Sequence, residues 1–137
     1  LLPNEINSQK RYIEEAFGKV ATYGLGLGYY ALHVALKDSV ERVDVVDISD
    51  DVINLFEQNI LPKFPDFVRK KIRIIKKDAF LFAKGLKDGD YDYIYADIWH
   101  DCQDGAELYP KFKALEGFCK TAKYGYWIED SIKYYLK

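Results

Sequence analysis

Glycines at alternate positions mark the first segment that could do chemistry. The sequence GLGLG, with Gly24, Gly26 and Gly28, follows an apolar run that ends at Tyr23. Missing β-carbons let such a backbone bend sharply and let a ligand approach it closely, and the N–H groups favour a carboxylate or phosphate. A strand-to-helix connection without any ligand explains the same residues. The dinucleotide fingerprint GxGxxG would need glycine at Tyr29, so nicotinamide and flavin cofactors are disfavoured.

The second candidate is Asp47, which closes a β-branched run and is followed by Ile48. It lies about 20 residues beyond the glycine turn, where a carboxylate can accept hydrogen bonds from both hydroxyls of a ribose. Asp47 could instead only begin the next helix. Because Ser49 and Asp50 already supply that cap, ligand contact is the preferred interpretation.

Asp78 and Ala79 come shortly after a third apolar run, residues 71–75. A carboxylate there could accept a hydrogen bond from the exocyclic amine of an adenine. Asp78 could equally cap the helix that follows, and the two roles can coexist.

Asp97 and His100 follow the fourth run and are the acid–base candidates. Asp97 is the first choice for a catalytic group, and a partly exposed loop imidazole explains His100 as well as catalysis does. In a second hypothesis Asp97 joins Asp130 or Glu129 in holding a divalent cation. Oxygen ligands without local spacing are common by chance, so we predict no metal.

Alternating strands and helices must position these residues. The pattern predicts strands at residues 19–23, 42–48, 71–75, 91–98 and 124–128, with helices at residues 29–37, 50–60, 79–86 and 106–120. This alternation indicates βαβ units and a parallel sheet, in which ligands bind beyond the carboxyl ends of the strands. We expect a single domain over residues 1–137, with a leading helix in 1–18, a core of 19–130 and an unclassified tail of 131–137.

Composition narrows the function classes. Twenty Lys and Arg residues against 22 Asp and Glu give a net charge of −2, so dedicated nucleic-acid binding is disfavoured. Only two cysteines occur, which argues against a disulfide framework and predicts a cytoplasmic setting. We also expect neither a membrane segment nor a signal peptide.

Four ordered blocks carry a resemblance to a known family. VATYGLGLG, VERVDVVDIS, KIRIIKKDAF and YDYIYADIW together resemble the class I S-adenosylmethionine-dependent methyltransferases, and within them the spermidine synthase-like branch. The resemblance implies a three-layer, Rossmann-like α/β fold whose open, mostly parallel sheet has about five strands in the order 3-2-1-4-5, with helices on both faces. The superfamily's final antiparallel hairpin is expected to be missing or shortened here.

The same resemblance implies the cofactor and the role of each site residue. S-adenosyl-L-methionine is the expected cofactor, with Gly24, Gly26 and Gly28 against its methionyl part, Asp47 on the ribose and Asp78 with Ala79 at the adenine. Tyr23, Ile48 and Asp97 are also expected to contact it. Asp97 is expected beside the sulfonium, where it or His100 could orient or deprotonate an acceptor.

The expected reaction is methyl transfer to a small amine- or hydroxyl-bearing acceptor. Aminopropyl transfer is the close alternative, although the second acid that polyamine synthases carry after the fourth strand falls here at His100. A binding module without turnover is the other alternative.

Charged residues and an open edge suggest the partners. Six acids could make the mouth of the cleft attract a cationic acceptor, or could be solvated loop residues: Asp97, Asp101, Asp104, Glu107, Glu129 and Asp130. Lysines and arginines around residues 63–77 are interpreted as protection of an edge strand. The fifth strand would form the other edge, which predicts self-association as a twofold dimer.

Overall fold

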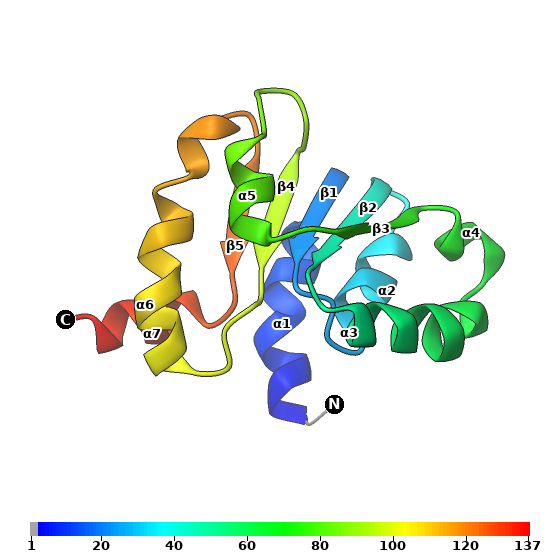
Figure 1. Ribbon diagram of the computed structural model, residues 1–137, viewed down its shortest axis with the longest axis horizontal. Coiled ribbons are helices and arrows are strands. Elements are labelled where there is room, and N and C mark those ends of the chain that lie inside the picture. Colours follow the sequence, from blue (N-terminus) through cyan, green and yellow to red (C-terminus); the bar gives the residue numbers. More distant parts are fainter. Residues whose placement is uncertain (1–2) are drawn as a thin grey trace.

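Five parallel strands form one sheet in the order β3-β2-β1-β4-β5 (Figure 1). The computed structural model describes residues 3–137, with side chains from residue 8 onward. The strands are β1 (Gly18–Tyr23), β2 (Val40–Asp47), β3 (Ile72–Lys76), β4 (Tyr93–Ala96) and β5 (Lys123–Tyr126). The predicted number of strands, their order and their parallel direction are confirmed.

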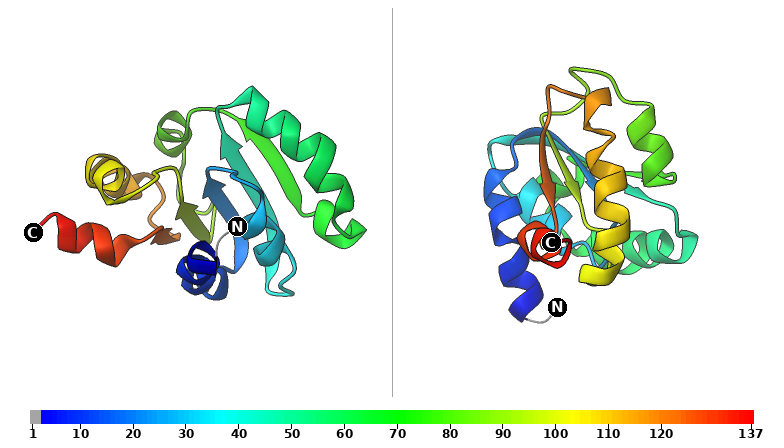
Figure 2. Two further views of the ribbon diagram at one scale, coloured as in Figure 1. Left: turned by 90° about the horizontal axis from the view of Figure 1, so that it is seen from below. Right: turned by 90° about the vertical axis from the view of Figure 1, so that its left-hand side faces the viewer.

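Helices cover both faces of this sheet. They are α1 (Pro3–Glu15), α2 (Tyr29–Ala35), α3 (Asp50–Leu55), α4 (Asp66–Arg69), α5 (Ala79–Lys84), α6 (Cys102–Lys113) and α7 (Glu129–Tyr135). The left view of Figure 2 shows α1 and α2 on one side of the sheet, and α5 and α6 on the other. The structure is therefore the three-layer, Rossmann-like α/β fold that the sequence predicts.

Alternation along the strands builds two apolar layers. On β4, Tyr93 and Tyr95 belong to the layer under α1 and α2, whereas Ile94 and Ala96 belong to the layer under α5 and α6. Successive side chains of a strand point to opposite faces, so a strand that is buried on both faces is apolar throughout. This explains why the central strand β4, Tyr93–Ala96, is apolar at every position.

Helix α1 is fastened to the sheet by aromatic stacking and by hydrogen bonds to its backbone. Tyr12 stacks on Tyr95 with 4.9 Å between ring centroids, and Tyr30 donates a hydrogen bond of 3.0 Å to the carbonyl of Tyr12. The ammonium of Lys37 reaches three carbonyls at the end of the helix, those of residues 13, 14 and 16. The leading helix thus packs on the same side of the sheet as α2.

Several predicted boundaries are wrong by a few residues. Helix α6 begins at Cys102 instead of residue 106, because the side chain of Asp101 caps it by accepting a hydrogen bond of 2.9 Å from the N–H of Asp104. The predicted helix over residues 50–60 divides into α3 and a wider π-helical turn, Phe56–Ile60. Most of the tail that the sequence left unclassified belongs to α7. Residues 1–2 of the predicted leading helix lie outside the described residues.

The sheet has two edges, β3 and β5. No antiparallel hairpin follows β5 within residues 3–137. Both cysteines are free. Across the described part of the chain, no helix combines the length and the apolar character needed to cross a membrane.

Candidate functional site

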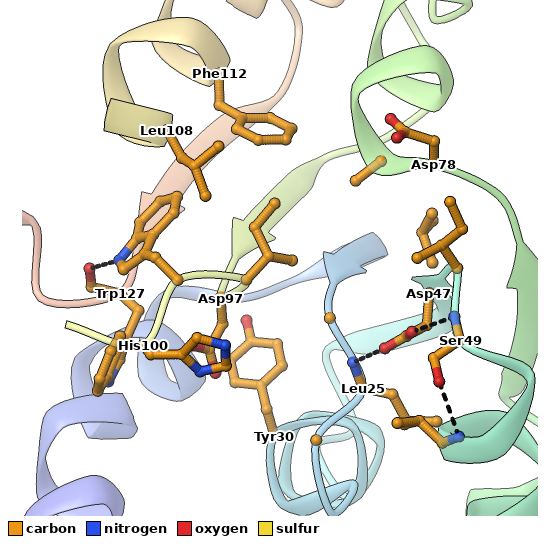
Figure 3. A pocket seen from close by; sticks show the side chains of 18 of the residues that line it. Leu25, Tyr30, Asp47, Ser49, Asp78, Asp97, His100, Leu108, Phe112 and Trp127 are labelled. Atoms are coloured by element: carbon orange, nitrogen blue, oxygen red, sulfur yellow. Dashed lines mark hydrogen bonds between the residues drawn. The ribbon is translucent and has the colours of Figure 1, made fainter. Parts of the chain in front are cut away.

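A cleft of about 740 Å³ opens at the carboxyl ends of the strands, where the sequence places its candidates. Such a volume is within the range of about 300–1,000 Å³ that small-molecule sites usually have. In Figure 3, Asp47, Ser49 and Asp78 lie on one side of it and Asp97, His100 and Trp127 on the other. Every predicted site residue lines this cleft except Tyr23 and Gly28.

The glycine loop after β1 follows its shape because side chains would not fit at two positions. Gly24 has φ +97°, and a β-carbon there would lie 2.4 Å from the carbonyl oxygen of Asp97. Gly28 has φ +81°, and a β-carbon would lie 2.3 Å from the ring of Phe56. These two glycines therefore admit the protein's own neighbours. Gly26 also has a positive φ but faces open space, so it is the position where a ligand can approach the backbone.

Asp47 joins the ends of two strands. Its Oδ2 accepts a hydrogen bond of 2.9 Å from the N–H of Leu25, and its Oδ1 accepts one of 2.9 Å from the N–H of Ser49. The cap of α3 is Ser49, whose hydroxyl accepts a hydrogen bond from the N–H of Val52. A carboxylate has about four lone-pair sites, so Asp47 keeps acceptor capacity toward the cleft. The neighbouring Ile48 is 63% exposed and offers an apolar surface at the rim.

Asp78 is a helix cap that also faces the cleft. Its Oδ1 accepts hydrogen bonds from the N–H groups of Phe80 and Leu81 at 2.8 and 3.2 Å, at the start of α5. The cap therefore uses one oxygen of the carboxylate, and Asp78 and Ala79 both line the cleft. The two roles weighed for Asp78 are compatible in this geometry.

Asp97 lies just beyond β4 and is held from α1. Its N–H extends the ladder by donating to the carbonyl of Tyr23 at 2.9 Å, and its Oδ2 accepts a hydrogen bond of 3.0 Å from the side-chain amide of Gln9. Gln9 is 8% exposed, and its Oε1 has no hydrogen-bond partner among the described residues. His100 is exposed and lines the same cleft. A carboxylate, an amide oxygen and an imidazole thus meet at this end.

Tyr23 and Gly28 contribute to the core instead of the cleft. The ring of Tyr23 packs between Phe82 and Phe112 in the layer under α5 and α6. Burial raises the pKa of Tyr23 well above its ordinary value, so the phenol stays neutral. Gly28 is the N-cap of α2 and packs against Phe56.

The cation hypothesis is not supported, because its acids do not meet. Glu129 is buried and accepts a hydrogen bond of 2.7 Å from the hydroxyl of Tyr109, whereas Asp130 is exposed and pairs with Arg11 at 3.6 Å. Neither residue lines the cleft with Asp97. Within residues 3–137 no group of three or more His, Cys, Asp or Glu side chains could hold a metal ion.

Fewer of the predicted acids line the mouth of the cleft than the sequence suggests. Of the six acids, Asp97 is the one that lines the cleft. Asp101 caps α6, and the side chain of Asp104 accepts a hydrogen bond from the N–H of His100. Of the six, Asp97 alone could attract a cation into the cleft, which Asp47 and Asp78 also line at its other end.

Sequence reasoning missed several lining residues. Tyr30 and Gln9 come from helices α2 and α1, and helical spacing alone does not say which turn of a helix reaches a strand end. Trp127 follows β5 directly and Trp99 lies on the loop after β4, so the rule that ligands bind beyond strand ends could have found them.

Comparisons with known proteins agree with this geometry. The family model of the spermine/spermidine synthase domain matches residues 15–122. Putrescine N-methyltransferase 4 of Nicotiana tabacum is 24% identical over 99 residues, and putrescine N-methyltransferase 1 of Nicotiana attenuata is 25% identical over 99. Each alignment covers 71% of this chain and 26% of the relative, so the chain spans about a quarter of the length of these proteins.

Solved structures share the fold at low identity. The spermidine synthase of Thermotoga maritima superposes with a TM-score of 0.55 and 19% identity, over 74% of this chain and 35% of that one. The methyltransferase domain of bacterial CtHen1-C gives 0.54 and 19%, over 81% and 57%. Both have the sheet and helices described above. The family model covers the part of the chain that contains strands β1 to β4. The chain therefore belongs to the spermine/spermidine synthase domain family.

Proposed function

We propose that this chain binds S-adenosylmethionine and transfers its methyl group to a small amine-bearing acceptor. The observation that carries the proposal is the division of the cleft into two ends. Asp47 and Asp78 line one end with Ile48 and the open face of Gly26, and Asp97 lines the other with Gln9 and His100.

The first end fits an adenosyl group. Asp47 retains lone pairs for ribose hydroxyls, and Asp78 has a second oxygen for an exocyclic amine. Ile48 supplies apolar contact, and Gly26 lets a methionyl chain approach the backbone. When bound, S-adenosylmethionine supplies an electrophilic methyl group.

The second end fits an amine. Asp97 accepts a hydrogen bond from the acceptor nitrogen and receives the proton that this nitrogen must lose. Gln9 holds the carboxylate at 3.0 Å, and Tyr30, Trp99 and Trp127 line the cleft with it. The relatives are putrescine N-methyltransferases, and this supports an amine acceptor over a hydroxyl.

Aminopropyl transfer is the second candidate, because the family model and the spermidine synthase structures support it equally. Titration calorimetry with S-adenosylmethionine, decarboxylated S-adenosylmethionine and NAD separates the candidates. We expect S-adenosylmethionine to bind, and transfer of a labelled methyl group to putrescine to follow. Binding of NAD alone would defeat the proposal, and product from the decarboxylated compound alone would favour aminopropyl transfer.

We place this activity in the cytoplasm. The support is the pair of cysteines, Cys102 and Cys119, which are free where an oxidising compartment would favour disulfides. Fractionation of cells that express the tagged protein tests this placement.

A further inference from the structure

Trp127 is held in the cleft at both its side chain and its backbone. Its indole Nε1 donates a hydrogen bond of 2.8 Å to the hydroxyl of Ser8 in α1. Its carbonyl accepts one of 2.9 Å from the indole of Trp99, which lies on the loop after β4 (Figure 3). Trp127 therefore links three separate segments at the end of the cleft that holds Asp97.

The hydrogen bond to Ser8 determines what Trp127 can offer a ligand. An indole has a single donor and no acceptor, and this donor is already used. The side chain is only partly buried and lines the cleft. What remains for a ligand is the aromatic surface of the ring, with its negative face.

The residue directly after Trp127 has an unusual backbone conformation. Ile128 has φ 49° and ψ 35°, and it is the one non-glycine residue with a positive φ in residues 3–137. Branched side chains rarely adopt this conformation, which persists where neighbouring contacts enforce it. Here Trp99 and Ser8 hold residue 127, and Tyr109 holds the buried carboxylate of Glu129.

We propose that Trp127 is a specificity-determining residue, whose ring face and the Asp97 carboxylate together select an alkylammonium acceptor over a neutral one of the same shape. This inference rests on the proposed function and deepens it. The carboxylate attracts the charged nitrogen, and the ring attracts the same charge through its quadrupole while covering the alkyl chain. A neutral alcohol can donate a hydrogen bond to the carboxylate, but it carries no charge for the carboxylate and the ring to attract.

Isothermal titration of wild type, Trp127→Phe, Trp127→Leu and Ser8→Ala tests the proposal. The ligands are the diamine putrescine and its neutral counterpart butane-1,4-diol, with S-adenosylhomocysteine present because it has no methyl group to transfer. Trp127→Leu should weaken putrescine binding roughly 3- to 30-fold and change diol binding less than twofold. Trp127→Phe keeps an aromatic face and should weaken putrescine by no more than about threefold.

Ser8→Ala is the matched control, because it removes the hydrogen bond to Nε1 and leaves the indole in place. We expect a smaller loss of putrescine affinity than for Trp127→Leu. Equal losses in Ser8→Ala and Trp127→Leu, or equal losses for putrescine and the diol, would mean that Trp127 acts only as a support. Either result overturns the proposal, as does unchanged putrescine binding in folded Trp127→Leu. If Trp127→Leu does not fold by circular dichroism, a loss of more than tenfold in Trp127→Phe overturns it instead.

Titration with S-adenosylmethionine separates this inference from the proposed function. All four proteins should bind it within twofold of one another. Failure of the wild type to bind it would defeat the proposed function, and the comparison of putrescine with the diol is then made without nucleoside. Wild type that binds S-adenosylmethionine but discriminates neither ligand overturns the role of Trp127 alone.

Discussion

The main-chain N–H of Leu25 donates a hydrogen bond of 2.9 Å to Oδ2 of Asp47, which ties the glycine loop to the end of β2. One carboxylate thus both shapes the loop and faces the cleft. Substitution of Asp47 should therefore disturb both the conformation of the glycine loop and the contacts of a ligand in the cleft.

Asp47→Ala should lower S-adenosylmethionine affinity roughly 100-fold or more. The reason is that the ribose hydroxyls of the ligand lose the two hydrogen bonds that they would donate to the carboxylate of Asp47. Titration calorimetry measures the change. Asp51→Ala is the matched control, since Asp51 is exposed in the first turn of α3 and lies outside the cleft. Similar losses in both variants would show that the role of Asp47 is misassigned.

Asp97→Ala should reduce methyl transfer roughly 10²- to 10⁴-fold and leave S-adenosylmethionine affinity nearly unchanged, because Asp97 serves the acceptor end. Steady-state rates and calorimetry on the same samples check both halves. Glu107→Ala, an exposed acid of α6 outside the cleft, should behave as wild type. An equal loss of cofactor binding in Asp97→Ala and Asp47→Ala would contradict the assignment.

A buried carboxylate away from the cleft gives a pH prediction. Asp44 is fully buried, which by itself would raise its pKa, but hydrogen bonds from Arg73 and Tyr91 outweigh burial and lower the pKa below the ordinary value of 3.8. A depressed pKa contributes stability that is present above pH 3.8 and is lost as the pH falls through the folded value.

Asp44→Asn should therefore lower the free energy of unfolding by about 1–3 kcal/mol at pH 7. The difference from wild type should shrink below pH 3.8. Urea unfolding at pH 7 and at successively lower pH measures both. A difference that does not change with pH would indicate that packing, and not charge, is responsible.

The β5 edge predicts self-association as a twofold dimer. Lys123 and Trp127 direct their N–H groups to β4, so the alternation of a parallel ladder turns those of Tyr124 and Tyr126 outward. The right view of Figure 2 faces this edge. We expect a dimer by light scattering, with hydrogen exchange of these two amides slowing as concentration rises. A monomer at high concentration argues against this.

The sheet could be predicted because runs rich in β-branched or aromatic residues alternate with helical patterns. Asp47 ends one such run, and Asp78 and Asp97 follow two others closely. Carboxyl ends of parallel strands lie on one edge, so these acids had to share a cleft. Gln9 and Ser8 could not be predicted, because their positions depend on how α1 docks through Tyr12 and Lys37. The prediction for Tyr23 failed because side chains alternate between the two faces of β1, and this alternation directs the ring of Tyr23 into the core.

Helix α1 contributes Gln9 to the cleft and holds Trp127 there through Ser8, but it is not part of the sheet. The end of the cleft that we propose for the nucleoside, by contrast, is built from loops that follow the strands of the sheet. A relative could therefore exchange this one helix and acquire a different acceptor while its donor pocket stayed intact. In this architecture, diversification of substrate and preservation of cofactor are assigned to separate stretches of chain.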